Sequence, residues 1–141
     1  MAQEWQLRFM KAFLLMAINA QSRGLRKAVQ NALSEAGVEL ANPELRPGAP
    51  VGDVLVDAIA SADFVIADIS NASPNVFYEL GYAHAMRKNT LMLVSKNASP
   101  KIPSDLEGSF YLTYDPEDPE QVASYITRTA LSLKERREAI A

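Results

Sequence analysis

Five short, mostly apolar runs constrain the fold of this 141-residue chain more than any other feature of its sequence. They lie at residues 12–18, 38–40, 64–67, 90–94 and 110–113. Short apolar runs of this kind are typical of strands that are buried on both faces. Such strands form the parallel sheets of α/β proteins, in which helices cover both faces of the sheet.

Stretches with helical spacing of their apolar residues separate these runs. They lie at residues 22–36, 51–60, 75–87 and 119–138. In the second of them we expect Val51, Val54 and Leu55 to face inward, and Gly37 is placed to end the first. This alternation predicts a flavodoxin-like or Rossmann-like doubly wound sheet of five parallel strands in the order 2-1-3-4-5. The length predicts a single domain, residues 1–141.

The composition excludes several classes of function. The chain has no cysteine, which rules out disulfides, thiolate metal sites and cysteine nucleophiles. Its one histidine, His84, cannot form a multi-histidine metal site, and we expect it to be a packing residue. A net charge of −3 gives no sign of binding to nucleic-acid polymers. No run reaches the roughly 20 apolar residues of a membrane span, and no signal peptide is evident, so we predict a cytoplasmic location.

Two polar loops mark the expected ligand site. Residues 19–23 follow the first predicted strand, and residues 68–75 follow the third. Doubly wound sheets bind ligands outside the carboxyl ends of their strands, at the point where strand order reverses. For the predicted order, that crevice lies between strands one and three. Both loops lead into helix N-termini, which favour an anionic group such as a phosphate.

Five side chains of these loops are predicted to bind substrate or to cap helices. They are Asn19, Ser22, Arg23, Ser73 and Asn75. Capping alone would explain Ser22, Ser73 and Asn75, because short polar side chains are preferred at helix starts. The two interpretations are compatible, since a loop that caps a helix can also contact a ligand. Arg23 would add a positive charge beside the first helix.

Two carboxylates are predicted to act in catalysis. Glu79 lies at the margin of the apolar face of the helix at residues 75–87, where it is either a solvated residue or a site residue. We expect its place in the first turn to favour the ionised form, which suits a nucleophile. Asp68 follows a buried strand, and its alternative role is that of a turn aspartate bonded to nearby backbone.

Two neighbouring segments carry a family resemblance. They are Ala-Asp-Phe-Val-Ile-Ala-Asp-Ile-Ser at residues 62–70 and Ser-Pro-Asn-Val-Phe-Tyr-Glu-Leu-Gly-Tyr-Ala-His-Ala at residues 73–85. Together they resemble the nucleoside 2-deoxyribosyltransferase-like family, which includes nucleotide N-hydrolases. TIR-like domains carry a similar Asn-Val-x-x-Glu-Leu stretch. The resemblance implies that Glu79 attacks the anomeric carbon of a sugar and that Ser73 helps to hold a 5′-phosphate. Asn75, Tyr78 and Asp68 would contact the ribose or the base.

The second carboxylate of the family is not found at its expected position. That position is occupied by Leu55, and Asp53 and Asp57 lie on either side of it. We therefore name Asp53 and Asp57 as possible orienting carboxylates. The resemblance implies chemistry that needs neither a metal nor another cofactor, because carboxylates and hydrogen-bond donors suffice to cleave an N-glycosidic bond.

Three functions follow from these observations. The first is cleavage or transfer at the N-glycosidic bond of a nucleoside or a nucleoside 5′-monophosphate. The second is a TIR-like signalling module that binds or hydrolyses NAD or another nucleotide, and the third is a catalytically silent nucleotide-binding protein. The expected partners are a small nucleoside or nucleotide and further copies of the chain in a homo-oligomer. In such an oligomer, Tyr111 or Tyr114 would complete a neighbouring site.

Overall fold

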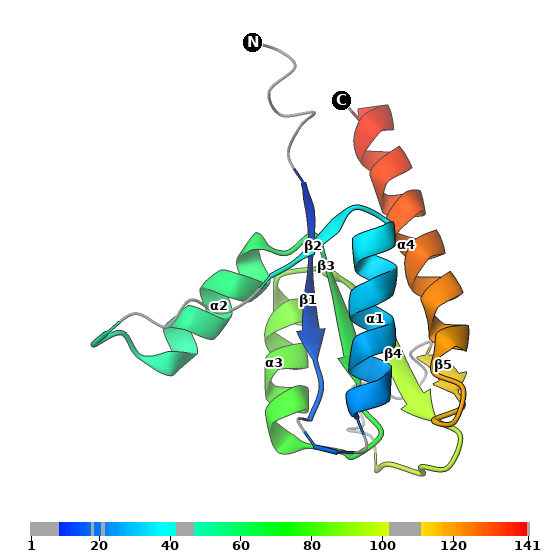
Figure 1. Cartoon of the computed structure of the whole chain (residues 1–141). Helices are drawn as coiled ribbons and strands as arrows, with labels where there is room; N and C mark the ends of the chain where they lie inside the picture. Colours follow the sequence, from blue (N-terminus) through cyan, green and yellow to red (C-terminus); the bar gives the residue numbers. More distant parts are fainter. Residues whose placement is uncertain (1–8, 18, 21, 42–46, 102–110, 141) are drawn as a thin grey trace.

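A five-stranded parallel sheet forms the centre of the molecule (Figure 1). The computed structural model describes residues 9–17, 19–20, 22–41, 47–101 and 111–140. The strands are β1 (Met10–Leu15), β2 (Val38–Leu40), β3 (Phe64–Asp68), β4 (Asn89–Ser95) and β5 (Tyr111–Tyr114). Their order in the sheet is β2-β1-β3-β4-β5. The predicted doubly wound fold and its strand order are confirmed.

Four helices cover the two faces of the sheet. Helices α1 (Arg23–Glu35) and α4 (Glu120–Ile140) pack on one face, and α2 (Val51–Ser61) and α3 (Pro74–Ala85) pack on the other (Figure 1). Each face has its own apolar core, because alternate residues of a strand point to opposite sides. In β1, Ala12 belongs to the core under α1 and α4, and Phe13 belongs to the core under α2 and α3. None of the described helices is long and apolar enough to cross a bilayer.

Local chemistry explains where two of the helices begin or end. Helix α1 is followed by Gly37, whose φ of +69° is in the left-handed region that glycine adopts without strain. Helix α3 begins at Pro74, whose fixed φ suits the first helical position. The helix therefore starts one residue earlier than the sequence predicted.

Two sequence predictions about packing are wrong. Val51 is 64% exposed rather than inward-facing, because it is the first residue of α2, whose start lies away from the sheet (Figure 1). Strand β1 ends at Leu15 rather than at residue 18, since its pairing with β3 ends where Leu15 meets Ala67. Residues 18 and 110, which the predicted strands included, lie outside the described residues.

Candidate functional site

A pocket of about 430 Å³ opens beside Glu79, within the size range of small-molecule sites. We call it the Glu79 pocket. Its walls come from β1, β2, α1, α2, α3 and the chain next to them, and they combine apolar side chains with a few polar ones. Its lining residues are Phe13, Leu14, Met16, Ala17, Arg26, Leu40, Ala41, Leu55, Ser73, Asn75, Val76 and Glu79.

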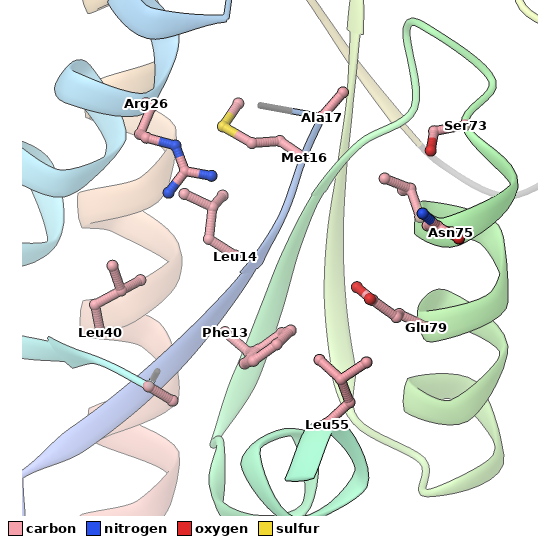
Figure 2. Close-up of a pocket in the computed structure, with 12 residues that line it drawn as sticks. Phe13, Leu14, Met16, Ala17, Arg26, Leu40, Leu55, Ser73, Asn75 and Glu79 are labelled. Carbon is pink, nitrogen blue, oxygen red and sulfur yellow. The ribbon is translucent and has the colours of Figure 1, made fainter. Parts of the chain in front are cut away.

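The position of the pocket follows from the short second strand. Strand β2 pairs with β1 only as far as Ala12, and β1 continues beyond it to Leu15. Side chains from both faces of β1 therefore reach the pocket, Phe13 from one face and Leu14 from the other. In Figure 2 the Glu79 carboxylate points from α3 into this space, and the Arg26 guanidinium extends into it from α1 on the opposite side.

Glu79 lies in a partly desolvated environment. It is half-buried, and burial raises its pKa above the ordinary value of 4.5. No hydrogen bond or ion pair joins it to another residue in the described part of the chain. It lies five residues after Pro74, so α3 has no acidic residue in its first turn. The prediction that a first-turn position favours the ionised form is therefore wrong, because desolvation by the pocket acts instead.

Ser73 and Asn75 line the pocket at the start of α3. Ser73 is the residue before the helix, but its hydroxyl makes no capping hydrogen bond. Capping therefore does not explain the presence of a serine here, and its hydroxyl is available to a ligand in the pocket. Sequence reasoning missed Arg26, and Arg23, which it named instead, is exposed and outside the pocket. No sequence signal distinguishes Arg26 from Arg23, because both lie at the start of α1 and the direction of each side chain depends on tertiary packing.

The predicted orienting carboxylates do not line the Glu79 pocket. Asp53 and Asp57 are exposed on α2, whereas Leu55 between them lines the pocket. Leu55 thus occupies the place where the resembled family has its second carboxylate. Among the described residues, Glu79 is the one acid that lines this pocket.

A second pocket, of about 370 Å³, lies at the carboxyl ends of β3, β4 and β5. We call it the Asp68 pocket. It is lined mainly by amide and hydroxyl side chains, and it includes two of the residues predicted to bind substrate, Asn19 and Ser22. The full lining is Asn19, Ser22, Asp68, Ser70, Asn71, Ser95, Asn97, Ala98, Tyr114 and Pro116. The two predicted catalytic carboxylates therefore line different pockets.

The Asp68 carboxylate is engaged by the protein itself. It accepts hydrogen bonds from the Tyr114 hydroxyl at 3.0 Å, from the Ser70 hydroxyl at 2.5 Å and from the Ser70 backbone N–H at 3.1 Å. The last contact is that of a turn aspartate, which was the alternative interpretation. The Ser70 hydroxyl also accepts the Ser95 N–H at 2.7 Å, which joins the ends of β3 and β4.

Ser22 and Asn19 form a closed turn after β1. The Ser22 hydroxyl donates to the Ala17 carbonyl at 2.7 Å, and the Ser22 N–H donates to the Asn19 side-chain oxygen at 2.8 Å. The Ser22 hydroxyl makes no capping bond to α1, although Ser22 precedes the helix as predicted.

Of three further predicted residues, Tyr78 and His84 lie away from both pockets, whereas Tyr114 lines the Asp68 pocket. Tyr78 is 61% exposed, and its hydroxyl is 3.1 Å from that of Tyr82. His84 is exposed near the end of α3, so the expectation that it is a packing residue is wrong; the helix turns it toward solvent. Tyr114 is only 7% exposed, and burial raises its pKa to about 12. Its hydroxyl therefore bonds to Asp68 within its own chain. Tyr111, the other tyrosine expected at a contact between copies, is more exposed than Tyr114.

This arrangement suits carboxylate chemistry. The Glu79 pocket combines one carboxylate, one guanidinium and one unengaged hydroxyl with apolar walls. A half-buried carboxylate can stabilise or attack a cationic carbon, and an arginine can bind a phosphate. Among the described residues, no cluster of histidine, aspartate and glutamate is arranged to hold a metal ion.

Comparison with known families gives one match that spans most of the chain. The family described as "CAP12/Pycsar effector protein, TIR domain" matches residues 15–116. This range includes every described residue of the Glu79 pocket except Phe13 and Leu14. No curated protein matches the chain significantly.

Solved structures of enzymes and of TIR domains share the fold. The CMP N-glycosidase BcmB of Clostridium botulinum is 23% identical, with a TM-score of 0.64, over 82% of this chain and 98% of that one. The TIR domain of the Toll-related receptor TRR-2 from Hydra magnipapillata is 15% identical, also with a TM-score of 0.64, over 84% and 96%. A 2-deoxyribosyltransferase from Bacillus psychrosaccharolyticus is 20% identical, with a TM-score of 0.55, over 78% and 90%. At these identities the likeness shows a common fold.

Proposed function

The chain belongs to the CAP12/Pycsar effector TIR-domain family, and from that membership we propose that it hydrolyses the N-glycosidic bond of NAD with Glu79 as the catalytic carboxylate. The observation that supports this most strongly is the half-buried Glu79 carboxylate, which points into a pocket of ligand size (Figure 2). NAD hydrolysis was the second of the functions drawn from the sequence. The family match now favours it over the first.

The proposed reaction needs only this carboxylate and water. The bond between the ribose anomeric carbon and the nicotinamide nitrogen breaks, and its electron pair leaves with the nicotinamide, which departs as a neutral base. Glu79 bonds to the anomeric carbon and forms a glycosyl-enzyme. Water then attacks the same carbon, loses a proton to solvent and releases ADP-ribose and the free carboxylate. Desolvation favours the first step, because a poorly hydrated carboxylate is attracted more strongly to the developing cation.

Two polar groups in the same pocket are proposed to bind phosphate. Arg26 extends into the pocket from α1, and the Ser73 hydroxyl has no capping role. A guanidinium binds phosphate through paired hydrogen bonds, and a hydroxyl adds another donor. Together they would hold the phosphate that is attached to the ribose under attack.

A nucleoside 5′-monophosphate is the second candidate substrate. The presence of Ser73 in the Glu79 pocket supports it, because the resembled nucleotide hydrolases use a serine at this position for the 5′-phosphate. The same pocket and the same carboxylate would act, and the leaving group would be the base of the nucleotide.

A panel of substrates tests the proposal and separates the two candidates. Purified protein is incubated with NAD, nicotinamide mononucleotide, CMP and cytidine, and the released base is measured by chromatography. We expect release from NAD, and its loss by at least about 100-fold in Glu79→Gln, as for loss of an essential catalytic group. Glu120→Gln, an exposed glutamate at the start of α4, is the matched control and should keep full activity. Release from CMP alone would favour the second candidate, and no release at all would refute both.

We also propose that the chain acts in the cytoplasm as a homo-oligomer that consumes a small nucleotide. Tyr111 lies on β5, the strand at one edge of the sheet, and is 42% exposed. It would lie at the contact between copies. Light scattering of the wild type and of Tyr111→Ser measures this directly. A monomeric wild-type protein at micromolar concentration would contradict the proposal.

A further inference from the structure

The Asp68 pocket has the chemistry of a site for a neutral, polar ligand. No lysine or arginine lines it in the described part of the chain, and Asp68 is its one acidic residue. A phosphate would find no counter-charge there. Its volume of about 370 Å³ is within the range of small-molecule sites. Amides and hydroxyls dominate its walls, and such groups recognise nucleobases and sugar hydroxyls.

Two asparagines on its rim are not used by the fold. Asn71 and Asn97 are exposed, and neither side-chain amide bonds to another described residue. Asn19 differs from them, because its side-chain oxygen already accepts the Ser22 N–H. An asparagine amide offers a donor and an acceptor side by side. This pair matches the N6–H and N7 of adenine.

The loop after β3 and the start of α1 each contribute residues to both pockets. After β3, Asn71 lines the Asp68 pocket and Ser73, two residues on, lines the Glu79 pocket. At the start of α1, Ser22 lines the Asp68 pocket, and Arg26, one helical turn on, lines the Glu79 pocket. Two residues of chain span at most about 7 Å. One ligand with two nucleoside halves can therefore reach both pockets, with its phosphates near Arg26.

We propose that the Asp68 pocket binds the second nucleoside of a dinucleotide substrate, the adenosine of NAD, through the amides of Asn71 and Asn97. This inference rests on the proposed function, which assigns the nicotinamide ribose to the Glu79 pocket. The buried network of Asp68, Ser70 and Tyr114 forms the floor of the subsite and keeps its shape. The subsite would give a purpose to a polar pocket without a described basic residue beside the pocket that contains Arg26.

Binding of adenosine tests the subsite without relying on turnover. Calorimetry measures adenosine binding to the wild type, Asn71→Ala, Asn97→Ala, Glu79→Gln and the control Asn31→Ala, an exposed asparagine of α1. We expect each rim variant to weaken binding about tenfold, the typical effect of one lost hydrogen bond. Glu79→Gln and Asn31→Ala should bind as the wild type does. Both rim changes are at exposed positions, and a thermal melt checks that the variants fold.

The kinetic counterpart compares NAD with nicotinamide mononucleotide, which lacks adenosine. The rim variants should raise KM for NAD about tenfold and leave KM for the mononucleotide unchanged. Equal effects on both substrates, or adenosine binding that is absent or insensitive to the rim variants, would overturn the subsite. If neither substrate is cleaved but adenosine binds through the rim asparagines, the proposed function fails and the subsite stands.

Discussion

The Glu79 carboxyl is half-buried and has no described residue as an ion-pair partner. Burial therefore raises its pKa above 4.5, and the folded protein prefers the neutral acid. The stability that this preference contributes is fully present below pH 4.5 and is lost as the pH rises through the folded-state pKa. At neutral pH the ionised Glu79 thus destabilises the fold, which is the usual thermodynamic cost of a reactive group.

Removing this charge should stabilise the protein at neutral pH. We predict that Glu79→Gln raises Tm at pH 7 by a few degrees at most, because the carboxylate remains partly hydrated. At pH 4 the difference from the wild type should disappear, since both side chains are then neutral. Thermal melts at the two pH values measure this. A lower Tm for the variant at pH 7 would contradict the assigned environment of Glu79.

The same raised pKa should appear in the activity. If Glu79 reacts as the ionised group, kcat/KM falls as the pH drops, with a midpoint above 4.5. A pH–rate profile between pH 4 and pH 8 locates the midpoint. A midpoint below 4.5 would show that the acting carboxylate is not in a desolvated environment.

Arg26 lines the Glu79 pocket, and its proposed role is to bind the phosphate of the substrate. We predict that Arg26→Gln raises KM for the cleaved nucleotide by about 10- to 100-fold, because a hydrogen bond to a charged group is lost. Lys27→Gln, at the neighbouring exposed position of α1, is the control and should have no effect. Steady-state kinetics measure both. An unchanged KM in Arg26→Gln would place the phosphate elsewhere.

At the scale of elements, the Asp68 network joins the ends of three strands. Tyr114 at the end of β5 donates to Asp68 at the end of β3, and Ser70 connects this pair to Ser95 at the end of β4. Buried networks of this kind rigidify the loops that follow the strands. The loop after β3 leads to Ser73 and so to the wall of the Glu79 pocket.

Loss of the Tyr114 hydroxyl leaves the buried Asp68 carboxylate short of a donor. We predict that Tyr114→Phe lowers the free energy of unfolding by about 1–3 kcal/mol, the usual effect of an unsatisfied buried group. Tyr125→Phe, an exposed tyrosine of α4, is the matched control and should change little. Urea unfolding measures both variants. Equal stability of Tyr114→Phe and the wild type would mean that the network contributes nothing.

Strands, helices and their order could be predicted because apolar periodicity and helix-end residues are local signals. Gly37 after α1 is an example, and the run at residues 64–67 lies within β3. The end of β1 could not be predicted, because Met16 is buried yet lies beyond the strand's pairing with β3. Local hydrophobicity does not report where a partner strand ends.

The site was only partly predictable, for a different reason. Polar residues at the carboxyl ends of strands one and three were expected to form one crevice. The structure brings residues of both loops together in the Asp68 pocket, which includes Asn19 and Asp68, but it places Glu79 in the other pocket. Side-chain direction depends on tertiary packing, so Arg26 reaches the pocket and Arg23 does not. A sequence pattern predicts at which edge of the sheet the polar residues lie, but it does not predict which pocket each side chain lines.

At the scale of the whole molecule, the two pockets share a few residues with the two apolar cores, but most core residues line neither pocket. The core under α1 and α4 includes Ile126, which is fully buried. Ile126 lines neither the Glu79 pocket nor the Asp68 pocket. Stability and activity should therefore respond independently to a change at this position.

Truncation of this side chain tests that independence. We predict that Ile126→Ala lowers the free energy of unfolding by about 2–5 kcal/mol through cavity formation. At a temperature where the variant is folded, kcat/KM should equal that of the wild type. Urea unfolding measures the free energy of unfolding, and a kinetic assay measures kcat/KM. The assay is run at about 15 °C, close to the temperature at which typical proteins are most stable. A parallel loss of kcat/KM would show that α4 is coupled to the site.

The most direct test of the central claim is nicotinamide release from NAD by the wild type and by Glu79→Gln, measured side by side at equal concentrations of folded protein. Glu79 is the one acid that lines the pocket in the described part of the chain, so its replacement removes the only carboxylate among these lining residues. We predict steady release by the wild type and release at least about 100-fold slower by the variant. Equal release by the two proteins would contradict the assignment of Glu79 as the catalytic carboxylate.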